Sequence, residues 1–186
     1  MISGEKTILE RVQRGDAEAF EQIYNSYVSK MFRFAFLKIG DKETAEDIAS
    51  ETFMKFWFYA QKNKINGETA EPMLYKIARN LIIDFYRKKE LVTTYIDEDI
   101  MDTVPDVKSD FLSRMINQEE VEEMMLVLKE LKDEYQEIII LRFVEEMSIE
   151  EVVEITGKSS GSVRVLSHRA LKSLERVMRL RENKIV

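Results

Sequence analysis

Residues 148–174 read SIEEVVEITGKSSGSVRVLSHRALKSL, and this stretch decides the fold. Ser148 and Glu151 have the spacing of a capping box, in which the Ser hydroxyl accepts an amide N–H and the Glu carboxylate reaches back to the cap. The spacing predicts a short helix that ends near Thr156. Gly157 follows, and glycine suits the left-handed conformation that ends helices. We therefore expect a sharp turn directly after a short helix.

A longer, basic helix is expected beyond this turn, capped by Ser159 or Ser160. Apolar residues occupy one side of it, and Lys, Arg and His occupy the other. The inward residues are Val163, Leu166, Ala170, Leu171 and Leu174, and the outward residues are Arg164, His168, Arg169, Lys172, Arg176 and Arg179. A basic helix alone is more often a solvated surface. The capping box, the turn glycine and the one-sided charge together predict a helix-turn-helix, whose second helix enters the DNA major groove.

Charge is distributed unevenly along the 186 residues. The net charge of −7 by itself disfavours a nucleic-acid partner, because phosphate neutralisation supplies much of DNA affinity. Residues 158–181, however, hold seven Lys/Arg against one Asp/Glu, and residues 73–90 hold five against two. Residues 119–154 hold thirteen Asp/Glu against three Lys/Arg. This alternation predicts two nucleic-acid contacts, with other surfaces facing a basic partner.

The first ninety residues predict a compact helical bundle. Apolar residues recur at helical spacing from 17 to 37, after the capping residue Asp16, and again from 43 to 57. A third helical pattern covers residues 74–85, with Pro72 in the first turn, where its missing N–H costs nothing. These patterns indicate helices that each bury one face against the others.

Helical periodicity fades over residues 91–117, which carry six Asp/Glu and are the best candidate for a linker. Residues 91–96 and 138–141 could be strands on composition alone, although the second run lies within a longer helical pattern. The sequence thus predicts an all-α protein with two small helical domains, residues 1–90 and 118–186, joined by a flexible acidic linker.

Composition excludes several classes of chemistry. Cysteine is absent, which removes disulfides, thiolate metal sites and thiol redox switches. His168 is the single histidine, so sites built from several histidines are excluded. We find no phosphate-binding glycine loop, nucleophile elbow or calcium-loop spacing. We therefore expect no enzymatic activity, no cofactor and no metal.

The start of the chain has no basic stretch followed by an apolar one, and no apolar run approaches the ~20 residues of a membrane span. We expect a cytoplasmic protein that is neither exported nor membrane-spanning.

Three motifs, in this order along the chain, resemble those of bacterial RNA polymerase sigma factors. Residues 47–53 resemble the polymerase-core-binding helix of that family, and residues 74–84 resemble its promoter-melting and minus-ten-recognition helix. Residues 128–143, 147–152 and 162–171 resemble its C-terminal domain. Two domains joined by one acidic linker point to the extracytoplasmic-function (ECF) subgroup of the primary-sigma family, and the resemblance covers nearly the whole chain.

The resemblance implies a sigma factor that binds core RNA polymerase and directs promoter-specific transcription initiation. Residues 1–90 would bind core polymerase and recognise and melt the minus-ten element, and residues 118–186 would recognise the minus-thirty-five element. The linker would thread toward the RNA exit path of the polymerase. Promoter DNA, core RNA polymerase and an anti-sigma factor are the implied partners.

Three sets of candidate site residues follow from the resemblance. The upstream-element contacts are Ser162, Arg164, His168, Arg169 and Lys172. The minus-ten and melting contacts are Tyr75, Lys76, Arg79, Asn80, Arg87 and Lys88. The polymerase-core contacts are Glu43, Glu46, Asp47, Ser50 and Glu51. Without the resemblance, the last set would be interpreted as a solvated acidic face.

Some features of these helices qualify the assignment. Phe56 and Trp57 are expected in the core, whereas part of Phe58-Tyr59 must be exposed. The exposed member of that pair, together with Tyr75 and Tyr86, could stack on unpaired bases beside the cations of residues 76–88. Asp84 is expected to pair with Arg87 or Lys88.

Three residues depart from the family pattern, namely Ser50, Lys158 and Val165. The last lies in the recognition helix and weakens any promoter sequence inferred by analogy.

Two other classes of function stay open. One is a stand-alone helix-turn-helix regulator whose N-terminal bundle dimerises or senses a ligand, which would bind a palindromic site unaided. The other is a helical interaction protein, such as an anti-sigma factor or an adaptor, in which the basic helix is incidental and DNA has no effect.

Overall fold

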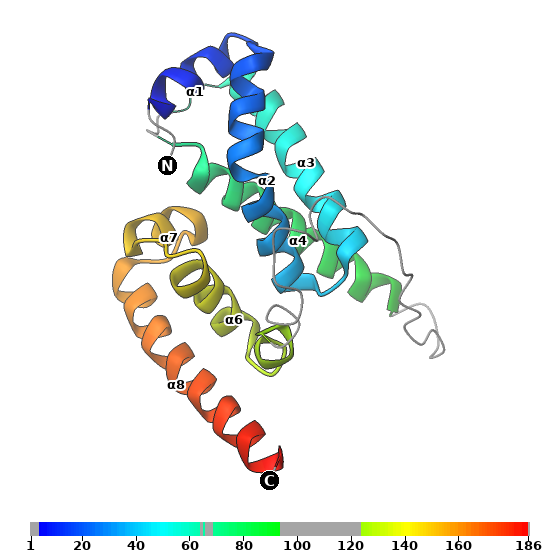
Figure 1. The fold of residues 1–186 in the computed structure, drawn as a ribbon, viewed down its shortest axis with the longest axis vertical. Helices are drawn as coiled ribbons and strands as arrows, with labels where there is room; N and C mark the ends of the chain where they lie inside the picture. Colours follow the sequence, from blue (N-terminus) through cyan, green and yellow to red (C-terminus); the bar gives the residue numbers. More distant parts are fainter. Residues whose placement is uncertain (1–3, 64, 66–68, 94–123, 186) are drawn as a thin grey trace.

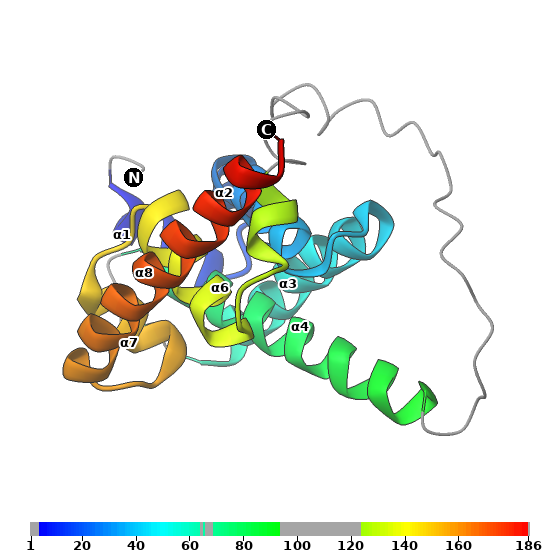
Figure 2. The ribbon, with the colours of Figure 1, turned by 90° about the horizontal axis from the view of Figure 1, so that it is seen from below.

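The computed structural model describes residues 4–63, 65, 69–93 and 124–185, and only the backbone at 90–93 and 182–185. Every regular element in these ranges is helical, and none of the described residues forms a strand (Figures 1 and 2). The all-α prediction is confirmed for this part of the chain. In the same residues, no helix combines the length and the apolar character that a membrane span requires.

The first domain is built from α1 (Glu5–Gln13), α2 (Ala17–Ile39), α3 (Lys42–Lys62) and α4 (Glu71–Thr93). An aspartate caps each of the two central helices. Asp16 accepts the amide of Ala19 at 3.1 Å, and Asp41 accepts that of Thr44 at 2.8 Å. Gly40 ends α2 with a φ of 83°, a left-handed conformation that glycine adopts without a steric penalty. The sequence therefore sets both ends of α2 locally.

The core of the first domain is rich in aromatic and long aliphatic side chains. Phe34, Phe56 and Leu74 are fully buried, from α2, α3 and α4 respectively. The ring of Phe20 meets that of Trp57 edge-on at 4.8 Å between centroids. Because a buried side chain of this size contributes about 1.5–3 kcal/mol, the aromatic contacts between α2 and α3 provide much of this domain's cohesion.

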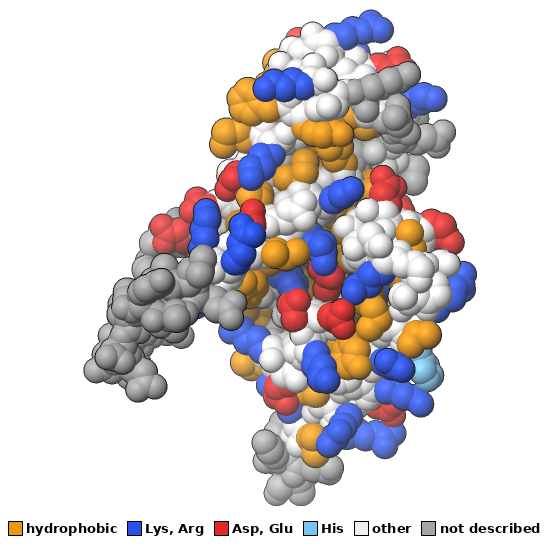
Figure 3. Space-filling view, turned by 180° about the vertical axis from the view of Figure 1, so that it is seen from behind, with side chains coloured by type: hydrophobic (Ala, Val, Ile, Leu, Met, Phe, Trp, Pro, Cys, Tyr) orange, Lys and Arg blue, Asp and Glu red, His pale blue; other side chains and the backbone are white. Residues whose placement is uncertain are grey.

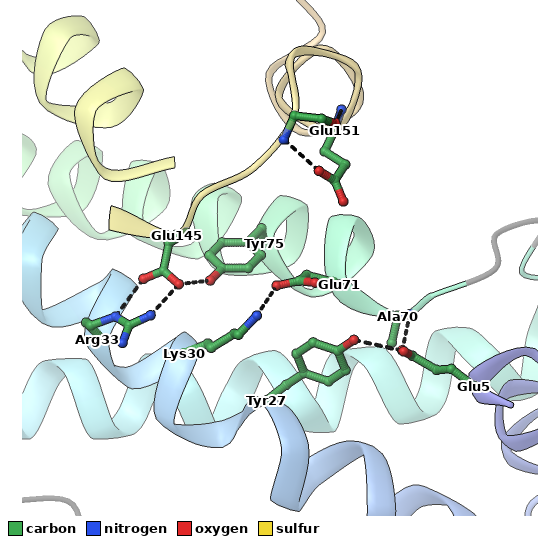
Figure 4. Close-up of polar contacts among 10 residues, drawn as sticks. Glu5, Tyr27, Lys30, Arg33, Ala70, Glu71, Tyr75, Glu145 and Glu151 are labelled. Atoms are coloured by element: carbon green, nitrogen blue, oxygen red, sulfur yellow. Dashed lines mark hydrogen bonds and ion pairs between the residues drawn. The ribbon is translucent and has the colours of Figure 1, made fainter. Parts of the chain in front are cut away.

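A buried carboxylate ties α1 to the rest of the bundle (Figure 4). Glu5 accepts the Tyr27 hydroxyl at 2.9 Å and the amide of Ala70 at 2.8 Å. Burial, and then the charge of Glu5, raise the pKa of Tyr27. One side chain thus joins α1, α2 and the residue that precedes α4.

The second domain begins, in the described residues, with a helical stretch at 124–128. It continues with α6 (Asp133–Ile139), the π-helical segment η1 (Ile140–Val144), α7 (Ile149–Thr156) and α8 (Ser160–Ile185). The apolar run at 138–141 is helical, as its longer pattern predicts, and strand is the wrong alternative there.

The segment after η1 has an unusual backbone. The amide of Glu145 bonds to the carbonyl of Ile140 at 2.9 Å, five residues back, which completes the wide turn of η1. Glu146 follows with a φ of 56°, in the left-handed region that non-glycine residues rarely occupy. This turn directs the side chain of Glu145 toward the first domain (Figure 4).

The predicted boundary after residue 90 falls inside a helix, because α4 continues to Thr93. The acidic linker residues lie beyond it, outside the described residues; they are Asp97, Glu98, Asp99, Asp102, Asp106 and Asp110.

The two domains pack against each other, with α7 against α4 and one buried apolar cluster continuing across both. Gln136 in α6 donates to the carbonyl of Leu37 in α2 at 3.0 Å. Met125 approaches within 3.0 Å of where a Cβ on Gly40 would stand, so a larger residue would press on the second domain. In this arrangement the helix-turn-helix domain covers one side of the first domain (Figures 1 and 2).

Candidate nucleic-acid interface

The turn between α7 and α8 has the geometry of a helix-turn-helix. Ser148 accepts the amide of Glu151 at 3.2 Å, and the Glu151 carboxylate accepts the amide of Ser148 at 2.7 Å, which completes the capping box. Gly157 ends α7 with a φ of 70°. Ser159 then accepts the amide of Ser162 at 3.2 Å and so caps α8. The capping box and the turn glycine are confirmed, and Ser159 is the residue that caps the second helix.

The first half of α8 has one buried side and one exposed side. Val163 and Ala170 are fully buried. All five predicted upstream-element residues are exposed, and they are Ser162, Arg164, His168, Arg169 and Lys172. Lys and Arg side chains gather around the histidine in the lower half of Figure 3. Long donors are therefore presented to solvent at the end of α8 that a helix-turn-helix inserts into the major groove.

The start of α8 borders an open hollow lined by Lys158, Ser159, Ser162 and Arg169, among others. Lys158 forms an ion pair with Glu134 of α6 at 2.9 Å, which holds its ammonium group beside the turn. Amide groups of the first turn of α8, together with these cations, are suited to a phosphate group.

Four of the six predicted minus-ten residues are exposed on α4, and they are Lys76, Asn80, Arg87 and Lys88. Arg87 pairs with Asp84 at 2.9 Å, so the predicted role of Asp84 as an ion-pair partner is confirmed. Tyr86 is partly exposed and donates to the carbonyl of Lys38 at 2.6 Å. This part of α4 therefore offers cations, an amide and one aromatic ring to solvent.

Tyr75 and Arg79, the other two predicted minus-ten residues, face the second domain. Tyr75 is fully buried, its ring lies edge-on to Phe34, and its hydroxyl donates to Glu145 at 2.7 Å. Burial, and then the Glu145 charge, raise its pKa. Arg79 is bound by Glu137 at 2.7 Å. Tyr75 thus presents no ring face for a base in this arrangement, contrary to the stacking role predicted for it, because Phe34 and the second domain enclose it.

The predicted polymerase face lies on the outer side of α3, where Glu43, Asp47, Ser50 and Glu51 are exposed. Glu46 is only partly exposed, and one of its carboxylate oxygens is buried without a hydrogen-bond partner. This face is acidic, as the sequence predicts, and Glu46 is its least accessible member.

An apolar groove adjoins the acidic face, between α2 and α3. Phe20, Tyr24, Met54, Trp57 and Phe58 line it, together with Ser50 of the acidic face. Phe58 and Met54 are each 55% exposed. Phe56 is buried and Trp57 is partly buried, whereas Phe58 and Tyr59 are exposed, as the sequence predicts for this aromatic run.

The site predicted from the sequence does not include the polar contacts that join the two domains. Arg33 of α2 forms two hydrogen bonds with Glu145, at 2.8 and 2.6 Å, and Lys38 of α2 bonds to Asp133 and to Gln136 of α6. The hydrogen bond to Glu145 raises the pKa of Arg33. Lys38 interrupts the apolar run 34–39, and a lysine in such a run is a sequence signal of a buried ion-pair partner. The sequence does not show which acidic residue that partner is.

Among the described residues, no group of three His, Asp or Glu side chains is arranged so that it could hold a metal ion.

Comparisons with known proteins agree with this organisation. Residues 23–91 match the family model for sigma-70 region 2, and residues 122–174 match that for sigma-70 region 4. The ECF RNA polymerase sigma factor SigW of Bacillus subtilis is 30% identical, over 94% of this chain and 96% of its own length. The sigma factor SigV of the same species is 33% identical over 76% of this chain and 80% of its own.

Another relative, the ECF sigma factor BldN of Streptomyces coelicolor, is 29% identical over 92% of this chain, which spans 64% of the length of that relative. The chain belongs to the sigma-70 family of RNA polymerase sigma factors, in its ECF group, whose members direct transcription initiation.

Two solved structures share the fold. CnrH, determined in complex with the cytosolic domain of CnrY, has a TM-score of 0.70 at 17% identity, over 95% of this chain and 98% of its own. RpoE from Bartonella quintana, determined with the anti-sigma factor NepR, has a TM-score of 0.65 at 20% identity, over 86% of this chain and 96% of its own.

Proposed function

We propose that this chain binds core RNA polymerase through α3 and directs it to promoters through two separate DNA contacts. In this proposal the start of α8 reads the minus-thirty-five element, and α4 binds and helps to melt the minus-ten element. The observation that carries it is the one-sided first half of α8, with buried Val163 and Ala170 opposite exposed Arg164, His168 and Arg169. Such a helix is anchored on its own domain while it presents donors to a groove.

The α4 contact rests on Lys76, Asn80, Arg87 and Lys88, which are exposed in the matched region 2. Arg79 joins them when its bond to Glu137 is broken. Cations beside a partly exposed aromatic ring, here Tyr86, are the combination that binds single strands.

The polymerase contact rests on the acidic face of α3 and on the apolar groove next to it. An apolar centre with a charged rim is the usual anatomy of a protein interface. We assign Glu43, Asp47, Ser50 and Glu51 to the rim, where opposite charges on the partner raise the association rate more than the affinity.

An anti-sigma factor is proposed as a further partner, because RpoE from Bartonella quintana, which shares the fold, was determined with the anti-sigma factor NepR. We assign the chain a binding role and no catalytic one, and we place it in the cytoplasm with core polymerase.

The test is transcription in vitro with purified bacterial core polymerase, with and without this chain, on a genomic promoter library. Promoter-specific transcripts that depend on the chain are expected. Tight, sequence-specific DNA binding by the free protein at moderate salt, without any effect on core polymerase, would favour the stand-alone regulator. Absence of any effect on DNA or polymerase would favour the interaction protein.

A further inference from the structure

The polar part of the contact between the two domains is made largely by acids of the second domain and cations of the first. Glu145 meets Arg33 and Tyr75, Glu137 meets Arg79, and Asp133 meets Lys38. Figure 4 shows Glu145 reaching down between Arg33 and the Tyr75 hydroxyl. In these pairs every cation belongs to the first domain and every carboxylate to the second.

The three cations lie on two helices of the first domain that pack together. Arg33 and Lys38 lie on α2, and Arg79 lies on α4. Lys38 is almost completely buried, with 4% of its side chain exposed, and Arg33 and Arg79 are about a third and a quarter exposed. We name Arg33, Lys38 and Arg79 the cation strip. Without the second domain it would be an unpaired row of positive charge beside Lys76 and Asn80.

The bonding geometry at the strip is that of an oxyanion site. Glu145 receives two N–H groups of one guanidinium and a phenol hydroxyl, at 2.6 to 2.8 Å. The same fork of donors binds phosphate oxygens as readily as carboxylate oxygens. The carboxylates therefore stand where phosphate groups of a nucleic acid would be held.

In the closed arrangement, the free energy gained from these ion pairs is opposed by the cost of removing the charged groups from water. Glu145 has no exposed side-chain surface, so its three hydrogen bonds must offset the unfavourable burial of its charge. Removal of one partner would leave the other buried and unpaired. A competing polyanion that supplies new partners for the strip can therefore shift the equilibrium toward the open form.

We propose that the cation strip is a binding site for nucleic-acid phosphates, and that Asp133, Glu137 and Glu145 occupy it in the free protein. DNA at the strip and closure of the two domains then exclude each other. Arg33 and Lys38 become phosphate contacts in addition to the α4 residues. The proposal rests on the DNA role given to α4 above. A nucleic acid is favoured over an acidic protein because Arg79 is continuous with the exposed cations of α4.

The first experiment measures closure by energy transfer between two dyes. The chain has no cysteine, so Gln61→Cys and Met178→Cys, both at exposed positions on different domains, label the full-length protein specifically. The test variant is Glu137→Gln/Glu145→Gln. The control is Glu130→Gln/Glu154→Gln, which removes the same amount of charge. It leaves the contact between the domains intact, because Glu130 pairs with Arg181 inside the second domain and Glu154 is exposed on α7.

The test variant should show lower energy transfer than the parent at low salt, and the control should match the parent. Salt should lower the transfer of the parent, because ions weaken the partly exposed pairs. Equal transfer in the test variant and the parent would overturn the proposal that Glu137 and Glu145 hold the two domains together. The energy-transfer measurement involves neither polymerase nor a promoter, so its result can be interpreted even if the proposed promoter contacts fail.

The second experiment measures binding of a fluorescein-labelled, mixed-sequence single-stranded DNA to the same proteins. Opening raises the competent fraction, so the test variant should bind about fivefold to tenfold more tightly than the control when the closed form predominates. Arg33→Gln/Lys38→Gln should also open the domains but should bind the DNA more weakly than the parent. Circular dichroism and thermal unfolding verify that each variant is folded.

The opposite signs of these two effects separate a phosphate site from a merely structural contact. If opening leaves DNA affinity equal to that of the control, the nucleic-acid site is overturned, and an acidic protein segment becomes the partner that the strip fits. If the Arg33→Gln/Lys38→Gln variant opens and binds DNA as well as the test variant, the strip takes no part in DNA binding.

Discussion

The helices α8 and α4, the two proposed DNA readers, differ in what covers them. On α8 the five candidate contacts are exposed, and the buried side is filled by residues of its own domain. On α4 the outer residues are exposed, but Tyr75 and Arg79 bond to carboxylates of the other domain. The free molecule thus exposes all five proposed upstream-element contacts but only four of the six proposed minus-ten contacts. The difference teaches that packing between the domains covers part of one proposed reader and leaves the other uncovered.

The largest expected effect is on α8. Arg164→Ala or Arg169→Ala should reduce the preference of the polymerase complex for its upstream element by about 1–3 kcal/mol, because an arginine that bonds to a base edge carries discrimination. Lys172→Ala should weaken binding to all sequences alike, as expected of a phosphate contact. It should also lower the slope of log affinity against log salt concentration by about one. Competition binding on variants of the upstream element, at several salt concentrations, measures both. Equal loss of preference in all three variants would erase the distinction between base and phosphate contacts.

A smaller effect is expected on α4. Asn80→Ala should leave upstream binding intact and reduce strand opening several-fold, since a lost hydrogen bond costs about 0.5–1.5 kcal/mol. Permanganate reactivity of unpaired thymines in the polymerase complex reports opening. Asn25→Ala, at an exposed position on α2, is the matched control. If Asn80→Ala instead altered the upstream preference, the two helices would not act on separate elements.

The capping box should affect stability and not recognition. Ser148→Ala should cost about 1 kcal/mol of folding free energy, because the amide of Glu151 loses its acceptor. Denaturant unfolding followed by circular dichroism measures the loss. Ser167→Ala is the control, since that hydroxyl bonds to a carbonyl within α8 and starts no helix. A stability loss as large in the control would mean that the serine hydroxyls contribute alike and that the cap has no special role.

The smallest effect concerns the turn that directs Glu145 across the domain boundary. Glu146→Gly should stabilise the protein by up to about 1 kcal/mol, because a left-handed residue with a Cβ is strained and glycine is not. Glu154→Gly, within α7, should instead destabilise by about as much through lost helix propensity. Thermal unfolding of both variants gives the comparison. Destabilisation by both would show that the turn carries no strain at Glu146.

Local chemistry explains what could be predicted from the sequence. The capping box at Ser148, the turn at Gly157, the cap at Asp16 and the burial of Phe56 depend on residues close in the chain or on helical spacing. The family motifs located the two helices that are proposed to bind DNA. These features do not require knowledge of how the domains meet.

The interdomain contact could not be predicted in the same way. Arg33 and Glu145 are 112 residues apart, and no periodic pattern relates them. The family resemblance places Tyr75 among the minus-ten contacts, but its ring packs on Phe34. The π-helical segment 140–144 also has no sequence signal of the kind that caps give to α-helices. Tertiary packing decides these positions.

The length of α8 has a consequence for acidic groups at the start of the described second domain. Its 26 residues span about 39 Å at 1.5 Å per residue. Arg181, near its far end, bonds to Glu130 and to the carbonyl of Leu126, at the beginning of the described second domain. The first described residues of this domain therefore lie at one end of α8, and the proposed duplex contacts lie at the other. The Glu130 carboxylate, paired with Arg181, therefore lies several Debye lengths from the phosphates that the start of α8 would approach, so it does not repel them.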